Sequence, residues 1–499
     1  MLGCHFARSD GEGAVISDSG TPTARVRNPS ASSTSLNKTG TPMDLLATTS
    51  AVAVSSYALL STVYKSAQAL YARPASPASL RDERGQAEMA LPSVDVIVPS
   101  FNEDPNTLSD CLASIASQDY AGRLQVHVVD DGSANRDLVG PVHKIYATDP
   151  RFRIILLAKN VGKRKAQIAA IRSSSGDLVL NVDSDTILAA DVVTKLVLKM
   201  QDPDVGAAMG QLIASNRNET WLTKLIDMEY WLACNEERAA QARFGAVMCC
   251  CGPCAMYRRS ALALLLDQYE TQLFRGKPSD FGEDRHLTIL MLKAGFRTEY
   301  VPDAIAATVV PDSLGPYLRQ QLRWARSTFR DTFLALRLLP ELDGYLTLDV
   351  VGQNLGPLLL ALSSLAALAQ FVIAGSVAWW TLLTIAAMTM VRCSVAAFRA
   401  RDMRFLGFSL HTPMNIFLLL PLKAYALCTL SNSDWLSRKV IVTSDGEEKA
   451  VLPHATAGIS SARSGVSSAA VRKPGLSRRP SSLPATERVC GRDRSSAYK

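Results

Sequence analysis

Val94-Asp-Val-Ile-Val-Pro-Ser-Phe-Asn-Glu103 is an apolar run that ends in polar residues, the pattern of a buried strand followed by a polar loop. Three later stretches repeat this plan: Val126–Val129 before Asp130-Asp-Gly-Ser133, Ile154–Leu157 before Asn160-Val-Gly-Lys-Arg-Lys165, and Leu178–Val182 before Asp183-Ser-Asp185. Since helical stretches alternate with these runs, they predict βαβ units and a parallel sheet, that is, an α/β fold. Such sheets bind ligands at the carboxyl ends of their strands, so we predict that the polar ends meet in one functional site.

Asp183-Ser-Asp185 is the polar end best suited to a metal ion. Its spacing puts both carboxylates on one side of an extended segment, where they could bind a hard divalent cation together with phosphate oxygens. Such a pair is common in surface turns, so its weight comes from the convergence of the polar ends on one sheet edge. Two further groups follow, a carboxylate pair in Phe281-Gly-Glu-Asp-Arg-His286 and the cluster Gln320-Gln-Leu-Arg-Trp324.

Positive charge is concentrated at the C-terminus. The chain carries a net charge of +7, but residues 449–499 alone carry +8, which leaves the first 448 residues at −1. The main body has no basic surplus with which to neutralise a phosphate backbone, which disfavours general nucleic-acid binding. Residues 436–499 are polar without apolar periodicity and are predicted to be a disordered basic tail. Residues 1–42 are predicted to be a disordered extension, with Met43 as a possible true start.

Leu45–Tyr64 contains no Asp, Glu, Lys or Arg over 20 residues, enough for a helix that crosses a bilayer. A cleaved signal peptide is the alternative, favoured by Ala67-Gln-Ala69. The positive charge, however, follows the apolar run, as it does in a retained anchor. We therefore predict a transmembrane anchor over residues 43–72 and a cytosolic domain over residues 73–340.

The region after the domain contains two further apolar segments. Val350–Val391 is uncharged over 42 residues, which suits two membrane spans separated by a turn at Gly375-Ser376. Phe405–Leu422 is also uncharged but contains two prolines, so it either spans the membrane or forms a broken re-entrant or interfacial helix. If it spans, the tail lies on the far side; otherwise the tail lies beside the anionic cytoplasmic leaflet. We predict transmembrane or interfacial helices over residues 341–435.

The groups Asp-Asp-Gly-Ser, Asp-Ser-Asp, Gly-Glu-Asp and Gln-x-x-Arg-Trp, in this order, resemble those of the processive family-2 inverting glycosyltransferases, the chitin, hyaluronan and cellulose synthases. The resemblance covers residues 43–435. Cys249-Cys-Cys-Gly-Pro-Cys-Ala-Met-Tyr257 and Phe281–Thr288 are similar to the rhizobial nodulation group of chitin-oligosaccharide synthases. The resemblance implies a GT-A-type, Rossmann-like glycosyltransferase domain with N-terminal and C-terminal transmembrane helices, in the inner cell membrane with the catalytic domain in the cytoplasm.

The resemblance also implies a role for each matching residue. The donor, UDP-N-acetylglucosamine, would be held by Phe101, Glu103, Asp130, Asp131, Lys163, Lys165, Asp183 and Arg323. The catalytic group would be Asp284 as general base, with Glu283 and Asp183. The acceptor, a growing chitin oligosaccharide, would be closed in by Gly252, Pro253, Gln320 and Trp324. Asp185 would hold Mg²⁺ or Mn²⁺ at the donor diphosphate.

This chemistry requires separate carboxylates for the base and the cation. The base removes the acceptor hydroxyl proton while that oxygen attacks the anomeric carbon from the face opposite the leaving UDP. The departing diphosphate develops negative charge, which a divalent cation and Lys or Arg side chains neutralise. The sequence provides both kinds of group in separate motifs.

Each motif also has a structural interpretation. Glu283 and Asp284 could cap the helix that follows them, because acidic residues favour helix N-termini. Lys163–Lys165 could be a solvated helix face, and Trp324 could be only an interfacial anchor. His286 has no partner in the sequence and is expected to be structural.

The ten cysteines raise two other possibilities. Cys251-Gly-Pro-Cys254 has the spacing of a thioredoxin-type redox site, but it is embedded in a larger domain rather than in its own compact one. A zinc site is not expected, because no second Cys or His pair lies at ligand spacing. Free thiols are expected in the cytosol.

Three functions remain to be compared. The first is a chitin-oligosaccharide synthase that links N-acetylglucosamine units from UDP-N-acetylglucosamine, and the second is a hyaluronan or other polysaccharide synthase with the same motifs. Few and short C-terminal spans favour the short product. A non-catalytic membrane scaffold is the third, disfavoured because all the expected carboxylates are present. We predict a lipid bilayer as partner and no nucleic acid.

Overall fold

The computed structural model describes residues 42–72, 91–279, 281–341, 343–432, 440–442 and 448–450. The chain divides into two compact units, Met1–Ala67 with Asp343–Pro421, and Gln68–Leu342 with Leu422–Lys499. The predicted disordered extension and basic tail fall almost wholly outside the described residues. Of the predicted tail, only the short strands β11 (Val440–Val442) and β12 (Glu448–Ala450) are described.

The first half of the main sheet consists of the strands that the apolar runs predict. These are β1 (Val94–Ser100), β2 (Leu124–Asp130), β3 (Phe152–Leu156) and β4 (Leu178–Asn181). They pair in parallel in the order β3-β2-β1-β4. Every residue of β1 and β4 is buried, as expected for strands that helices cover on both faces. The α/β prediction is confirmed for this half.

The second half of the sheet is mixed, so the predicted parallel pairing holds for the four predicted strands and does not extend to the whole sheet. It adds β5 (Thr186–Leu188), β6 (Val205–Ala214), β7 (Ala255–Arg258) and β10 (Arg297–Thr308), giving the order β3-β2-β1-β4-β7-β6-β10-β5. β7 runs antiparallel to both β4 and β6, and β5 runs antiparallel to β10. β7 enters the sheet directly from the short 3₁₀ turn Gly252–Cys254, which places that turn at the sheet edge where the site forms.

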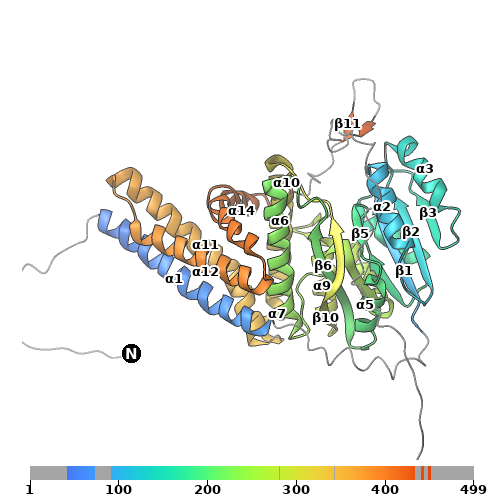
Figure 1. Cartoon of the computed structure of the whole chain (residues 1–499), viewed down its shortest axis with the longest axis horizontal. Helices are drawn as coiled ribbons and strands as arrows, with labels where there is room; N and C mark the ends of the chain where they lie inside the picture. The colour runs from blue at the N-terminus through green and yellow to red at the C-terminus, as the bar shows by residue number, and fades with distance from the viewer. Residues whose placement is uncertain are drawn as a thin grey trace, which may run out of the picture. The chain divides into compact units, whose positions relative to one another are not determined.

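Helices connect and cover the strands. They are α2 (Pro105–Ala116), α3 (Arg136–Tyr146), α4 (Lys163–Ser173), α5 (Val192–Met200), α6 (Trp221–Leu232), α7 (Ala239–Ala242), α8 (Arg259–Glu270), α9 (Glu283–Lys293) and α10 (Leu314–Ala335). A π-helical turn, Ala233–Arg238, joins α6 to α7, and the small hairpin of β8 (Leu273–Phe274) and β9 (Lys277–Pro278) precedes α9. Figure 1 shows these helices packed around the sheet.

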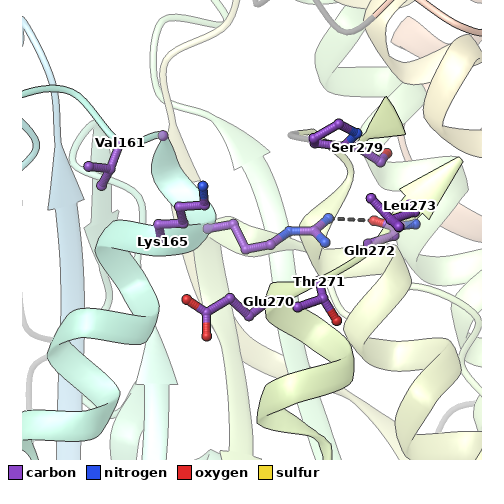
Figure 2. A pocket seen from close by; sticks show the side chains of 10 residues that line it. Val161, Lys165, Glu270, Thr271, Gln272, Leu273 and Ser279 are labelled. Carbon is purple, nitrogen blue, oxygen red and sulfur yellow. Dashed lines mark hydrogen bonds between the residues drawn. The ribbon is translucent and has the colours of Figure 1, made fainter. Parts of the chain in front are cut away.

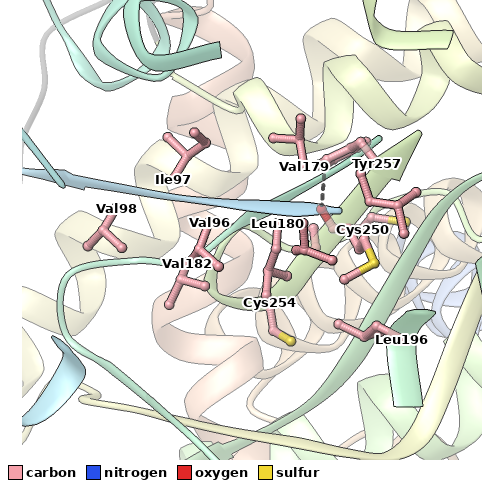
Figure 3. Packing of buried hydrophobic residues seen from close by; sticks show 14 of the residues in the cluster. Val96, Ile97, Val98, Val179, Leu180, Val182, Leu196, Cys250, Cys254 and Tyr257 are labelled. Atoms are coloured by element: carbon pink, nitrogen blue, oxygen red, sulfur yellow. Dashed lines mark hydrogen bonds between the residues drawn. The ribbon is translucent and has the colours of Figure 1, made fainter. Parts of the chain in front are cut away.

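The core lies between the sheet and its helices. Val96, Val98, Leu180 and Val182 are fully buried in it (Figure 3). Cys250 and Cys254 belong to the same cluster, and the Tyr257 hydroxyl donates to the Cys250 carbonyl at 3.4 Å. The core therefore fixes both ends of the segment that carries Gly252.

Within the described residues, four helical segments are long and apolar enough to cross a membrane. The first three are α1 (Pro42–Tyr71), α11 (Gly344–Ala374) and α12 (Trp379–Ala400). α11 and α12 are separated at Gly375, which adopts a left-handed conformation, so the predicted turn is confirmed. The Ser50 hydroxyl of α1 donates to the Ser363 carbonyl of α11 and hydrogen-bonds Thr381 of α12 at 2.6 Å.

The fourth segment, Met403–Cys428, is broken as its prolines suggest. It consists of a 3₁₀ helix (Met403–Leu410), α13 (His411–Met414), a π turn (Asn415–Leu419) and α14 (Leu420–Cys428). Proline removes a backbone donor and clashes with the preceding turn, which accounts for the irregular winding.

Candidate active site

The loops that follow β1, β2 and β4 are hydrogen-bonded to one another, so the predicted convergence of polar ends is confirmed. The Ser184 hydroxyl donates to Glu103 Oε2 at 2.5 Å, which joins the loop after β4 to the loop after β1. The Asn102 backbone N–H donates to Ser133 Oγ at 2.9 Å, and the Asn135 side chain donates to the Glu103 carbonyl at 2.8 Å. Glu103 is only 3% exposed within this network.

Asp130 and Asp131 accept hydrogen bonds from the backbone of the loops that form the site. Asp130 Oδ1 accepts from the Ser133 N–H at 2.8 Å and from Arg136 at 2.9 Å. The two oxygens of Asp131 accept from the N–H groups of Val161 and Gly162, at 2.8 Å and 2.9 Å. Burial outweighs these bonds and raises the pKa of Asp131. Contact of either carboxylate with a donor stays a prediction.

Lys163, the first residue of α4, lies between two carboxylates from different parts of the chain. Its Nζ is 2.6 Å from Asp183 Oδ1 and 2.9 Å from Glu283 Oε1. Burial opposes the charged amine, but Asp183 and Glu283 together outweigh it and raise the pKa of Lys163. The interpretation of Lys163–Lys165 as a solvated helix face is therefore wrong for Lys163, and also for Arg164, which is buried and donates to the Tyr269 carbonyl.

Gly252 connects the 3₁₀ turn before β7 to the carboxylate pair of α9. Its N–H donates to Asp284 Oδ2 at 3.2 Å. A Cβ atom at this position would lie 3.0 Å from Lys163 Nζ and 3.4 Å from Asp183 Oδ1. A larger residue here would therefore require the tip of the Lys163 side chain to shift by a few tenths of an ångström.

Glu283 and Asp284 are neighbours with opposite pKa shifts. Burial raises the pKa of Glu283, but the Lys163 ion pair more than reverses this and lowers it to about 2. Burial and the Glu283 charge raise the pKa of Asp284 above its ordinary value. Both residues lie in the first turn of α9, so the helix-capping interpretation describes their position, while the two shifts separate their chemistry.

Asp185 is the half-buried carboxylate that the motif assigns to a metal. Its Oδ1 accepts from the Thr308 hydroxyl at 3.2 Å, at the end of β10. Asp183 and Asp185 offer oxygen ligands, the type that Mg²⁺ and Mn²⁺ prefer. Mg²⁺ is commonly held by one or two carboxylates together with substrate phosphates, so this pair fits such an ion at a diphosphate.

Of the Gln320–Trp324 cluster on α10, Arg323 interacts with the charged group around Lys163. Arg323 is influenced electrostatically by Glu283, Asp284 and Asp183, although burial lowers its pKa overall. Gln320 is half-buried on the same helix, and Trp324 is 37% exposed. Phe101 is half-buried in the loop after β1, and Pro253 is half-buried in the 3₁₀ turn.

A cavity of about 420 Å³ adjoins the start of α4 (Figure 2). Val161 and Lys165 line it on one side, and Gln272, Leu273 and Ser279 line it on the other. Lys163 and Lys165 are thus placed differently: Lys163 pairs with carboxylates and Lys165 lines the cavity.

Sequence reasoning missed an anchor that positions the loop before Asp284. Arg330 donates to Ser279 Oγ at 3.0 Å and lies over the Phe281 ring at 4.6 Å. It also donates to the carbonyls of Leu430 and Asn432, at 2.8 Å and 2.7 Å. No local signal could identify Arg330, because its partners come from two segments far from it in sequence.

Comparison with known proteins identifies the family. Residues 95–266 match the family described as Glycosyl transferase family 2. An N-acetylglucosaminyltransferase of Bradyrhizobium diazoefficiens is 83% identical over 422 residues, which are 84% of this chain and 87% of that protein. This chain belongs to the rhizobial N-acetylglucosaminyltransferase family. Another member, from Rhizobium sp. strain N33, is 70% identical over 449 residues, 90% of this chain and 99% of that protein.

Among solved structures, the mannosyltransferase PcManGT of Pyrobaculum calidifontis, in complex with GDP-Man and Mn²⁺, aligns with a TM-score of 0.49 and 23% identity. The alignment covers 72% of this chain and 98% of that chain. Family membership confirms the predicted fold class, a GT-A-type glycosyltransferase domain accompanied by N-terminal and C-terminal candidate transmembrane helices.

Proposed function

We propose that this chain is an inverting N-acetylglucosaminyltransferase that polymerises UDP-N-acetylglucosamine into short β-1,4-linked chitin oligosaccharides. The observation that carries the proposal is the cluster around Lys163, where Asp183, Glu283 and the Gly252–Asp284 pair meet. The cluster supports the reaction class, and the names of the relatives support the sugar.

Asp284 is the base in this proposal, and its neighbour Glu283 is not. A carboxylate that stays charged down to a pKa of about 2 is a weak base, and Glu283 is committed to Lys163. Asp284 has a raised pKa, which brings it closer to the operating pH and favours proton acceptance. The acceptor hydroxyl gives its proton to Asp284, its oxygen bonds to the anomeric carbon, and UDP leaves with the electron pair.

Asp185 and Asp183 would hold Mg²⁺ or Mn²⁺, which neutralises charge on the departing diphosphate when bound. Arg323 would add positive charge beside Asp183, Glu283 and Asp284, because it interacts electrostatically with all three. Glu103, Asp130, Asp131 and Phe101 would form the nucleotide pocket.

We further propose that the protein lies in the inner cell membrane with its glycosyltransferase domain in the cytoplasm. The candidate membrane spans support an integral membrane protein. In this proposal the UDP-sugar donor reaches the active site from the cytoplasm. The bilayer and the growing oligosaccharide are then its partners.

The test is incubation of purified membranes with labelled UDP-N-acetylglucosamine, with and without UDP-glucuronate, followed by product sizing and chitinase digestion. We expect short, chitinase-sensitive products that do not need UDP-glucuronate. A long polymer that requires both donors would establish the alternative, a hyaluronan-type synthase.

The Asp284→Asn variant tests the base. Loss of a positioned base lowers transfer by ~10²–10⁴-fold. Binding of UDP should persist, because the nucleotide contacts lie on other loops. Turnover near the wild-type rate would remove Asp284 from this role.

A further inference from the structure

Two cysteines that the proposed reaction does not use lie against its base. The Sγ atoms of Cys249 and Cys251 and a carboxylate oxygen of Asp284 all lie within 4.8 Å of one another. The two sulfur atoms are 4.0 Å apart. The Gly252 N–H bond to Asp284 holds the cysteine segment against α9. All three residues are half-buried.

The spacing fits a tetrahedral metal site. Zinc–thiolate bonds of about 2.3 Å at tetrahedral angles place two sulfur ligands about 3.8 Å apart. The observed sulfur separation of 4.0 Å needs almost no adjustment. Sequence spacing alone did not indicate zinc, because the third ligand comes from a helix more than thirty residues later. Three protein ligands leave the fourth position open, as in catalytic rather than structural zinc sites.

The local charge also fits a divalent cation. Two thiolates and one carboxylate carry three negative charges, which a divalent ion reduces to one. The Arg238 guanidinium donates to Cys251 Sγ at 3.3 Å and balances the remaining charge. Cys250 and Cys254, in contrast, are fully buried in the apolar core and offer no ligand here (Figure 3).

We propose that Cys249, Cys251 and Asp284 form a binding site for a soft divalent cation of the Zn²⁺ class, distinct from the oxygen ligands at Asp183 and Asp185. Thiolates select soft and borderline ions, whereas carboxylates alone suit Mg²⁺ and Mn²⁺. Binding releases two thiol protons to the buffer. A metal on Asp284 occupies the lone pair that would accept the acceptor proton, so occupancy inhibits transfer; this consequence rests on the proposed function.

The binding test uses Cd²⁺ as a probe on the full-length protein in detergent, because cadmium–thiolate bonds absorb in the ultraviolet. We expect a saturable absorbance from one ion bound by two thiolates. Cys249→Ser and Cys251→Ser should each weaken binding at least tenfold, and Asp284→Asn should weaken it without removing the thiolate absorbance. Cys428→Ser, which removes an exposed thiol outside the site, should bind like wild type. Equal binding by the wild type and a Cys249→Ser/Cys251→Ser double variant overturns the proposal.

The activity test measures inhibition by Zn²⁺ at fixed Mn²⁺, with each variant compared with its own rate in the absence of Zn²⁺. Micromolar Zn²⁺ should inhibit the wild type and the Cys428→Ser variant, with recovery after chelation and renewed Mn²⁺. The two single variants at the site should resist inhibition. If Cd²⁺ binds as expected but neither the wild type nor the Cys428→Ser variant transfers sugar, the proposed function fails and the metal site stands. If transfer occurs and Cd²⁺ absorbance is absent, the metal site fails alone.

Discussion

Gly282 directly precedes Glu283 and Asp284 and so determines where this carboxylate pair lies. Its φ of +79° is in the left-handed region, and a Cβ there would lie 1.7 Å from Ser327 Oγ on α10. Gly282→Ala must therefore separate α9 from α10 as well as strain the backbone. We expect near-complete loss of transfer and a loss of stability larger by ~1–3 kcal/mol than the backbone strain alone causes.

Gly295→Ala is the matched control for this prediction. Gly295 has a similar φ of +85° at the other end of α9, but a Cβ there would meet nothing within 4 Å. Gly295→Ala should therefore lose only the stability that backbone strain removes, ~1–2 kcal/mol, and should keep its sugar-transfer rate. Thermal unfolding and transfer rates measure both. Equal behaviour of the two variants would contradict the role assigned to the α9–α10 contact.

Asp331 introduces a pH dependence of stability. Burial raises its pKa to about 7, and its Oδ1 accepts from the Gln272 side chain at 3.0 Å. Between pH about 4 and about 7, the folded state keeps a proton that the unfolded state has lost, so stability falls as the pH rises through this window. Asp331→Asn keeps the acceptor oxygen and removes the charge.

We therefore expect Asp331→Asn to be more stable than wild type at pH 8 and to differ little at pH 4. Thermal midpoints at the two pH values measure the difference. A variant that is less stable than wild type at pH 8 would show that the charged form of Asp331 is favoured in the fold.

At the scale of elements, the three adjacent basic residues at the start of α4 lie in three different environments. Lys163 pairs with Asp183 and Glu283, Arg164 donates to Gln272 at 2.6 Å, and Lys165 lines the cavity. Lys163→Gln removes the ion-pair partner of the buried Glu283 and the half-buried Asp183. Since removal of a single positioned donor from such a site costs ~10²–10³-fold in rate, we expect a loss of at least this size.

Lys165→Gln is the control, because it removes the same charge two residues later. We expect it to raise the donor KM with a much smaller change in kcat. Steady-state kinetics on both variants at saturating Mn²⁺ distinguish them. If Lys165→Gln had the larger kcat effect, the reactive centre would lie at the cavity and not at the Lys163 cluster.

The elements also show what sequence can predict. β1 to β4 were predictable because each contains a branched apolar run followed by polar residues, and β1 and β4 are wholly buried. β6 (Val205–Ala214) contains two glycines and three alanines among its ten residues, so it lacks that signal. The antiparallel insertion of β7 between β4 and β6 is a pairing choice that local apolarity does not encode.

The same limit applies to the site. The motif residues were visible in sequence because they follow strands or form compact groups. The Arg330 anchor and the approach of Cys249 and Cys251 to Asp284 were not, since both depend on how α9 and α10 pack after the chain has folded. Long-range packing, not local pattern, determines which thiols and carboxylates become neighbours.

At the scale of the whole molecule, the fourth apolar segment determines on which side the C-terminus lies. Met403–Cys428 is long and apolar enough to cross a bilayer. Its end, however, is hydrogen-bonded to the glycosyltransferase unit: Arg326 donates to Thr429 at 2.9 Å, and Arg330 donates to the Leu430 and Asn432 carbonyls. A segment that ended on the far side of the membrane could not make these bonds.

We therefore expect three crossings, by α1, α11 and α12, and a fourth segment that leaves the membrane on the side it entered. The C-terminus then lies on the same side as the glycosyltransferase domain, where a tail of net charge +8 meets an anionic leaflet. A reporter that fluoresces only in the cytoplasm, fused after Lys499, should be fluorescent, and a periplasm-dependent phosphatase fused there should be inactive. Fusions placed at Gly375, between α11 and α12, are the internal control and should give the reverse pattern, because one crossing separates them from the domain. Phosphatase activity at Lys499 would mean that Met403–Cys428 spans and that the Arg330 bonds to its end do not form in the membrane.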